Sequence, residues 1–202
     1  GKSALTVRFC QDRFSEEYDP TLEDSWTRRF PLDVDRQDMD KYLNHSSLAS
    51  SYADRQQITV DILDTAGREE FSATIDMWFR EGQVLLLVFD VMYQGSFNEI
   101  QGLYERILRA KQPEWTEKHD ETDFGIVCVG NKCDLREDPK YTQPSWRTVG
   151  PVDMEKAMKW FEEKKLPYIE TSAKTGRNVQ FLFRHSVFEY WMQSHSGCMP
   201  DY

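Results

Sequence analysis

The sequence lacks any apolar run that approaches the roughly 18–20 residues needed to span a bilayer as a helix. Basic residues are also scarce, because 25 Lys and Arg stand against 35 Asp and Glu, for a net charge of −10. This balance argues against a nucleic-acid-binding protein and against a general attraction to anionic lipid. The four cysteines and four histidines are dispersed without metal-ligand spacing. We therefore expect reduced thiols in a cytosolic protein and no zinc site.

What is present suits one folded domain. The 202 residues are 39% hydrophobic and 13% aromatic, which is enough apolar material for a core. Apolar runs at 84–89 and 124–130 lack alternation, which is typical of parallel strands buried on both faces. Further strands are predicted at 58–64 and 168–171, and helices at 1–10, 97–111, 154–164 and 179–192. Strands that alternate with helices predict an α/β fold with a mainly parallel sheet.

A segment rich in Asp and Ser interrupts this pattern at about 31–56. It follows a polar, extended stretch that runs to about Phe30, and its periodicity supports no more than a helical turn near 39–43. We interpret it as a long surface loop between two strands, because its composition buries little apolar area. A docking element is the alternative. The expected domain is 1–194 with this loop as an insertion, and 195–202 is a short tail.

Four short motifs stand at strand ends or at a helix start, where α/β folds bind ligands. Gly1-Lys2-Ser3 opens a helix and fits the end of the phosphate-binding signature G-x-x-x-x-G-K-[ST]. Asp64-Thr-Ala-Gly67 follows a strand, and a carboxylate there can hold Mg²⁺ through water. Asn131-Lys-Cys-Asp134 offers a carboxylate that can accept two hydrogen bonds from a guanine edge. Thr171-Ser-Ala-Lys174 follows another strand, and the four motifs are weak singly but specific together.

In this order the motifs closely resemble those of the small GTPases. The stretch 14–26 resembles the effector segment of the Ras branch, and Trp is absent ahead of Asp64, where Rab proteins usually carry it. Asn131 argues against most Rho proteins. The resemblance runs from Gly1 to about Met192. It implies the P-loop NTPase (small G-protein) fold, with a mainly parallel sheet flanked by helices. It also implies a signalling switch that binds GTP or GDP with Mg²⁺ and hydrolyses GTP.

The resemblance also implies roles for individual residues around the phosphates. Lys2 would contact the β- and γ-phosphates, and the backbone of Gly1 and Ala4 would lie against the phosphates. Magnesium would be held by three residues: Ser3, Thr21 and Asp64. Hydrolysis would involve three positions in two loops: Thr21, Gly67 and Arg68. Gly67 would donate its backbone N–H to the γ-phosphate.

The same resemblance assigns the base to the later motifs. Guanine would be selected by Asn131, Lys132 and Asp134, with support from Ser172, Ala173 and Lys174. Phe14 would pack against the guanine ring, although an aromatic residue there equally suits the core. Effector proteins would bind through Tyr18–Trp26, plausibly by strand pairing. An exchange factor and a GTPase-activating protein are further expected partners, and nucleic acid is not.

Three departures from the Ras pattern shape the expectations. The strand and the front of the phosphate loop that should precede Gly1 are missing, so we expect a gap in the sheet and poor nucleotide binding by the chain as given. Arg68 stands where the family carries Gln, which predicts slow hydrolysis because Arg has no acceptor to orient the attacking water. Extra residues near 113–122 and 137–149 lengthen two further segments.

The tail sets the expected location. Cys198 lies five residues from the end and so fails the prenylation pattern. We therefore expect a cytoplasmic protein, with membrane association at the cytoplasmic face of the plasma membrane as an option that no motif supports. Two alternatives to an active switch stay open at this stage. One is a binding module that remains loaded with GTP, and the other is a truncated chain that binds no nucleotide. An adenine-specific ATPase or kinase is disfavoured, since Asp134 would have no role there.

Overall fold

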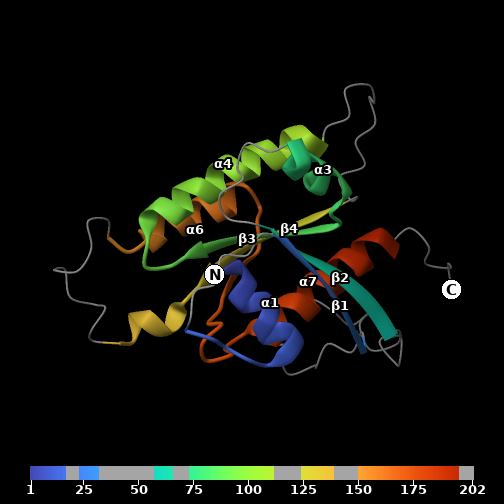
Figure 1. Ribbon diagram of the computed structural model, residues 1–202. Helices are drawn as coiled ribbons and strands as arrows, with labels where there is room; N and C mark the ends of the chain where they lie inside the picture. Colours follow the sequence, from blue (N-terminus) through green and yellow to red (C-terminus); the bar gives the residue numbers. More distant parts are fainter. Residues whose placement is uncertain (17–22, 32–56, 66–72, 112–123, 139–149, 196–202) are drawn as a thin grey trace, which may run out of the picture.

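The computed structural model describes residues 1–16, 23–31, 57–65, 73–111, 124–138 and 150–195 (Figure 1). Within these residues five strands, five α-helices and one 3₁₀ helix follow one another, with the long helix α4 (Gln94–Lys111) at the centre of the chain. Before it come α1 (Lys2–Gln11), β1 (Glu23–Pro31), β2 (Gln57–Thr65), α3 (Ala73–Glu81) and β3 (Val84–Asp90). After it come β4 (Gly125–Asn131), the 3₁₀ helix η1 (Cys133–Arg136), α6 (Met154–Glu163), β5 (Tyr168–Glu170) and α7 (Val179–His195).

The strands form two hydrogen-bonded groups within the described residues. β3, β4 and β5 form a parallel sheet in that order, and β1 pairs antiparallel with β2. In the parallel sheet Asp90 is the ladder partner of Asn131. In the antiparallel pair Pro31 lies opposite Gln57 and Asp24 opposite Asp64. This arrangement confirms the predicted α/β fold with a mainly parallel sheet in its larger group.

Helices cover both faces of the parallel sheet (Figure 1). On one face α4 and α6 bury a cluster that includes Phe89, Cys128 and Phe161. On the other face α1 and α7 bury a second cluster that includes Phe9 and Val129. Because successive side chains of a strand point to opposite faces, β4 supplies residues to both clusters. This double burial explains why its sequence is a continuous apolar run.

The observed elements match the sequence-based boundaries closely, with two additions. The predicted helices at 1–10, 97–111, 154–164 and 179–192 and the predicted strands all occur, shifted by at most three residues at an end. The extended stretch before Phe30 forms β1, and α3 was not predicted. The segment 32–56, including the helical turn expected near 39–43, lies outside the described residues. Within the described part of the chain, no helix has the length and apolarity to cross a membrane.

Candidate functional site

The carboxyl ends of β3 and β4 and the start of α1 meet at one edge of the parallel sheet. Asp90 and Asn131 end their strands side by side because they are ladder partners. Gly1 is the N-cap of α1, and its carbonyl oxygen lies 3.5 Å from the Asn131 Nδ2 donor. The start of α1 therefore lies against the end of β4. A helix N-terminus with free backbone N–H groups attracts anions, which makes this edge suitable for phosphate.

Asn131 connects three of the four sequence motifs. The side chain is only 2% exposed. Its Nδ2 donates to Gly1, as described above. Its Oδ1 accepts a hydrogen bond from the Ala173 backbone N–H at 3.1 Å and from the Thr171 hydroxyl at 3.4 Å. The amide therefore links the first, third and fourth motifs through both of its ends.

Lys132 and Asp134 follow Asn131 in a tight turn. Lys132 has a left-handed backbone with φ of 67°, and η1 begins directly after it. Its Nζ forms an ion pair of 2.8 Å with Asp90 Oδ2. The other Asp90 carboxylate oxygen, Oδ1, accepts the Met92 N–H at 2.9 Å. Asp134 is half-buried in the first turn of η1, and within the described residues its carboxylate forms no hydrogen bond or ion pair, so it can accept donors from a ligand.

The loop after β5 packs against η1. The Cys133 N–H donates to the Thr171 carbonyl at 3.1 Å, which joins the third and fourth motifs through their backbones. Arg136 at the end of η1 pairs with Glu170 at the end of β5. Ser172 is fully buried, and its hydroxyl accepts the Thr175 N–H at 3.1 Å. The two loops assigned to the base are therefore fixed to each other by backbone and side-chain contacts.

Lys174 of this loop and Phe14 lie on the side of the site near α1. The Lys174 ammonium forms an ion pair of 3.0 Å with Glu16 Oε1, and both side chains are exposed. Phe14 and Ala4 are partly buried and pack against the second core cluster. The core alternative for Phe14 is thus consistent with its packing, and a ring that borders the cluster can still present an edge to a ligand.

The phosphate end of the site is built from the first turn of α1 and the end of β2. Asp64 is 4% exposed, and burial raises the pKa of its carboxyl. A hydrogen bond from the Ser3 side chain and the nearby charge of Lys2 oppose that rise in pKa. One carboxylate oxygen, Asp64 Oδ1, is buried and has no hydrogen-bond partner among the described residues. A buried oxygen of this kind suits a bound cation, and Ser3 and Asp64 supply the oxygen ligands that Mg²⁺ prefers.

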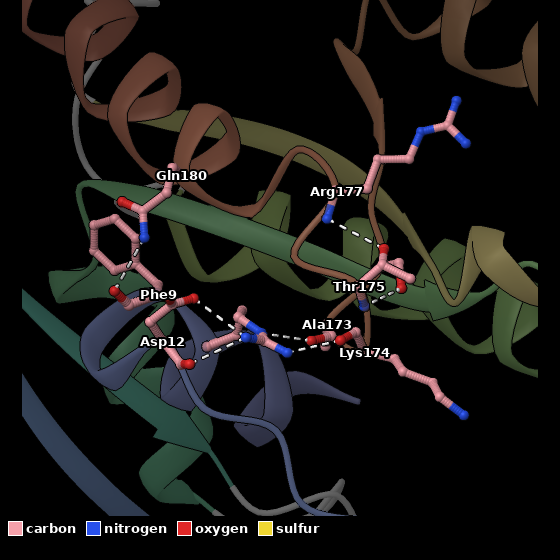
Figure 2. A network of polar contacts seen from close by, with 9 residues as sticks. Phe9, Asp12, Ala173, Lys174, Thr175, Arg177 and Gln180 are labelled. Carbon is pink, nitrogen blue, oxygen red and sulfur yellow. Dashed lines mark hydrogen bonds and ion pairs between the residues drawn. The ribbon is translucent and has the colours of Figure 1, made fainter.

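Three predicted site residues lie outside the described residues: Thr21, Gly67 and Arg68. Two contributors were missed from the sequence. Asp90 ends an apolar strand as Asn131 does, and that shared position was the available signal. Arg8 lies on α1 beyond the phosphate motif, and its guanidinium contacts the fourth motif (Figure 2). Nothing in the sequence around Arg8 indicates this contact.

A family model described as "Ras family" matches residues 1–190 of the chain. The chain belongs to the Ras family. It is therefore a small GTPase, a class of GTP-binding switches that generally hydrolyse GTP and work with regulators and effectors. Members bind guanine nucleotide, typically with Mg²⁺. Within this Ras-family chain the first, third and fourth motifs meet at one edge of the parallel sheet, and Asp64 of the second motif lies at the end of β2, hydrogen-bonded to Ser3.

Proposed function

We propose that this Ras-family chain selects guanine nucleotides through Asp134 and holds their phosphates and Mg²⁺ through Lys2, Ser3 and Asp64. The observation that carries the proposal is the Asn131 side chain, which joins the phosphate motif to both base motifs. A buried amide with both ends in use fixes the distance between the two ends of the site. A fixed spacing is what a ligand with a base at one end and phosphates at the other demands.

The base end supports guanine over adenine on chemical grounds. Guanine presents an N–H and an amino group side by side, and the Asp134 carboxylate accepts from both. Adenine lacks that pair of donors, so its binding would leave polar groups unmatched, at a cost of about 1–3 kcal/mol each. Ser172, Ala173 and Lys174 support the base from the other loop. We further propose that Phe14 borders the guanine ring.

The phosphate end supports a magnesium-dependent ligand. Lys2 contributes a positive charge, and the first turn of α1 contributes backbone N–H donors from Ser3 and Ala4. Asp64 and Ser3 would hold Mg²⁺, with Thr21 as the third ligand by family resemblance. The ion, when bound, neutralises phosphate charge. The orphaned Asp64 oxygen is the feature that supports this assignment.

We propose that hydrolysis is slow, because Arg68 stands where the family carries Gln. Phosphoryl transfer depends on positioning the attacking water and on stabilising charge. Arg has five donors and no acceptor, so it cannot receive a hydrogen bond from the water. The expected consequence is a switch biased toward its GTP state. If hydrolysis were negligible, the protein would be a binding module that stays loaded with GTP.

Partners and location complete the proposal. Effectors would bind through Tyr18–Trp26, of which residues 18–22 lie outside the described residues, and the exposed residues Asp24 and Ser25 of β1 are consistent with strand pairing there. An exchange factor and a GTPase-activating protein would act on the same end of the molecule. We place the protein in the cytoplasm, including the cytoplasmic face of the plasma membrane.

Competition binding on the full-length protein tests the base assignment. Labelled GDP is displaced by unlabelled GTP, GDP or ADP, and we expect GTP and GDP to compete at least roughly a hundredfold better than ADP. Asp134→Asn should weaken GDP binding strongly. Glu137→Gln is the matched control, because Glu137 lies just beyond η1 and its carboxylate pairs with Arg177 at 3.1 Å. Equal competition by ADP would overturn the proposal.

A further inference from the structure

Arg8 joins the helix that carries the phosphate motif to the loop that carries a base motif. Its Nε donates to the Ala173 carbonyl at 2.9 Å, and its Nη2 donates to the Lys174 carbonyl at 2.6 Å. These two residues are 165 and 166 positions away along the chain. Figure 2 shows Ala173 and Lys174 on one side of this network and Asp12 on the other.

The guanidinium is held in place from its own helix. Nη1 donates to the Asp12 carbonyl at 3.0 Å and forms an ion pair of 3.2 Å with the Asp12 carboxylate. The Arg8 side chain is 17% exposed, whereas that of Asp12 is 87% exposed. Asp12 is also the residue that ends α1, with a left-handed backbone at φ of 53°. The Arg8 guanidinium is therefore already oriented, and its contacts with the loop cost little side-chain conformational entropy.

The two backbone polar groups of Ala173 form hydrogen bonds to different parts of the protein. The N–H of Ala173 donates to Asn131, and its carbonyl accepts from Arg8. Hydrogen bonds with a charged donor are stronger than neutral ones, particularly where water has limited access. Arg8 therefore adds a charged contact from α1 to a loop that the Asn131 side chain and the backbone of Cys133 hold from the side of β4.

From this geometry we infer that Arg8 is a positioning residue for guanine, which sets the placement of the base loop at 172–174 from the phosphate helix. The inference rests on the proposed function, since it assigns a role within that site. The Arg8 donors contact the Ala173 and Lys174 carbonyls and Asp12, so Arg8 would act through the loop and not on the base itself. A displaced loop would shift the guanine away from Asp134, and directional hydrogen bonds weaken steeply when their angle changes. The loss should therefore appear as faster release and as poorer discrimination.

The test is Arg8→Met in the full-length protein, which keeps the apolar stem and removes the donors. We expect GDP to dissociate roughly tenfold faster. We also expect a smaller preference for GDP over inosine diphosphate, which lacks only the amino group that Asp134 would accept. Arg8→Lys, with a single nitrogen in place of the fork, should lie between the wild type and Arg8→Met in both measurements.

Gln180→Met is the matched control. Gln180 Nε2 on α7 donates to the Phe9 carbonyl at 3.3 Å, so it also ties α1 to the C-terminal part of the chain without touching the base loop (Figure 2). It should lower the midpoint of thermal unfolding slightly and leave the nucleotide preference unchanged. If Arg8→Met fails to fold, Arg8→Lys carries the same comparison.

The outcomes separate two failures. Unchanged release and unchanged preference in Arg8→Met would overturn the inference while the proposed function stands. Faster release with an unchanged preference, matched by Gln180→Met, would show general destabilisation and would also overturn it. A wild-type protein with no preference for GDP over ADP would overturn the proposed function, and this inference with it.

Discussion

Each end of the candidate site contains a buried polar side chain, but the two side chains differ in how fully the protein satisfies their hydrogen bonds. At the base end, Asn131 is 2% exposed, and both ends of its amide form hydrogen bonds within the protein. At the phosphate end, Asp64 is 4% exposed, yet one of its oxygens has no partner among the described residues. The base end is thus a framework that the protein completes by itself. The phosphate end holds a charge that a ligand or ion must complete.

This difference assigns distinct tasks to the two ends. A self-satisfied network specifies shape, because every polar group in it has a partner and the groups hold one another in place. An incompletely paired buried carboxyl gains most from a cation, because burial has raised its pKa and disfavours its charge. We therefore expect mutation of Asn131 to destabilise the protein itself, and mutation of Asp64 to act through the ligand.

The largest expected effect is the loss of the base framework in Asn131→Ala. The substitution leaves the buried Ala173 N–H without its acceptor and opens a small cavity, so the free energy of unfolding should fall by about 3 kcal/mol. Urea denaturation in the absence of nucleotide measures the change. Asn98→Ala is the control, because Asn98 is exposed on α4 and its side chain accepts a hydrogen bond from the neighbouring Gln94 side chain. A loss below about 1 kcal/mol would contradict the idea of a self-completed base end.

Asp64→Asn should act through the ligand instead. An amide cannot match the charge of a carboxylate toward Mg²⁺, so GDP should dissociate at least roughly tenfold faster in the presence of Mg²⁺, equivalent to about 1.4 kcal/mol. The measurement is release of labelled GDP with Mg²⁺ and with EDTA. In EDTA the variant and the wild type should differ little. An equally large difference without Mg²⁺ would place the role of Asp64 in the fold.

Arg68→Gln sharpens the comparison on the catalytic side. Restoring a side chain with both an acceptor and a donor should accelerate single-turnover GTP hydrolysis by roughly tenfold, and more with an activating protein. GDP affinity should stay within about twofold of the wild type, since binding relies on other residues. Arg68→Ala is the control that removes the charge without supplying an acceptor. If Gln gives no acceleration over Arg or Ala, Arg68 does not limit hydrolysis.

The smallest expected effect concerns a titrating group outside both ends. The ring centroids of His185 and Phe181 lie 4.9 Å apart in a stacked arrangement. Burial lowers the pKa of His185, and the charge of nearby Glu189 opposes that shift. Below the ordinary pKa of about 6.5 the unfolded chain binds a proton that the folded protein resists, so stability falls with decreasing pH until the folded pKa is passed.

Denaturation between pH 8 and pH 5 measures this acid sensitivity. We expect His185→Gln to flatten the slope and Glu189→Gln to steepen it, each by less than about 1.4 kcal/mol, the equivalent of one unit of pKa. The distance from His185 Nδ1 to Glu189 Oε1 is 3.9 Å, which is long for a strong pair. An unchanged slope in His185→Gln would attribute acid sensitivity to other groups.

Much of the fold follows from the sequence because local signals agree with the tertiary arrangement. The apolar runs at 84–89 and 124–130 became β3 and β4, since a strand buried on both faces needs no polar residues. The short helix α3 was not predicted, because nine residues give too few repeats for a clear helical period. Six of the nine residues of β1 are polar, and its pairing with β2 is what makes it a strand.

The sequence predicts which motifs form the site, but it does not predict the hydrogen bonds and ion pairs that connect them. Asn131, Ser172 and Ala173 were each predicted to serve the base, and their juxtaposition follows once the strands are parallel. The Arg8 contact spans 165 positions and depends on how α1 crosses the loop, which no local pattern encodes. The pairing of Lys132 with Asp90 likewise required the register of β3 against β4.

Two of the long segments of this chain precede strands, whereas the site residues lie at the ends of strands. Pro31 lies opposite Gln57, so the segment 32–56 enters the fold at the start of β2, while Asp64 stands at its other end. The segment 112–123 likewise precedes β4, and Asn131 closes that strand. An insertion at either place leaves the spacing among the site-bearing ends untouched. Two of the three lengthened segments of this G protein therefore enter the fold away from the strand ends that carry the site, whereas the third, at 137–149, follows the Asn131 motif.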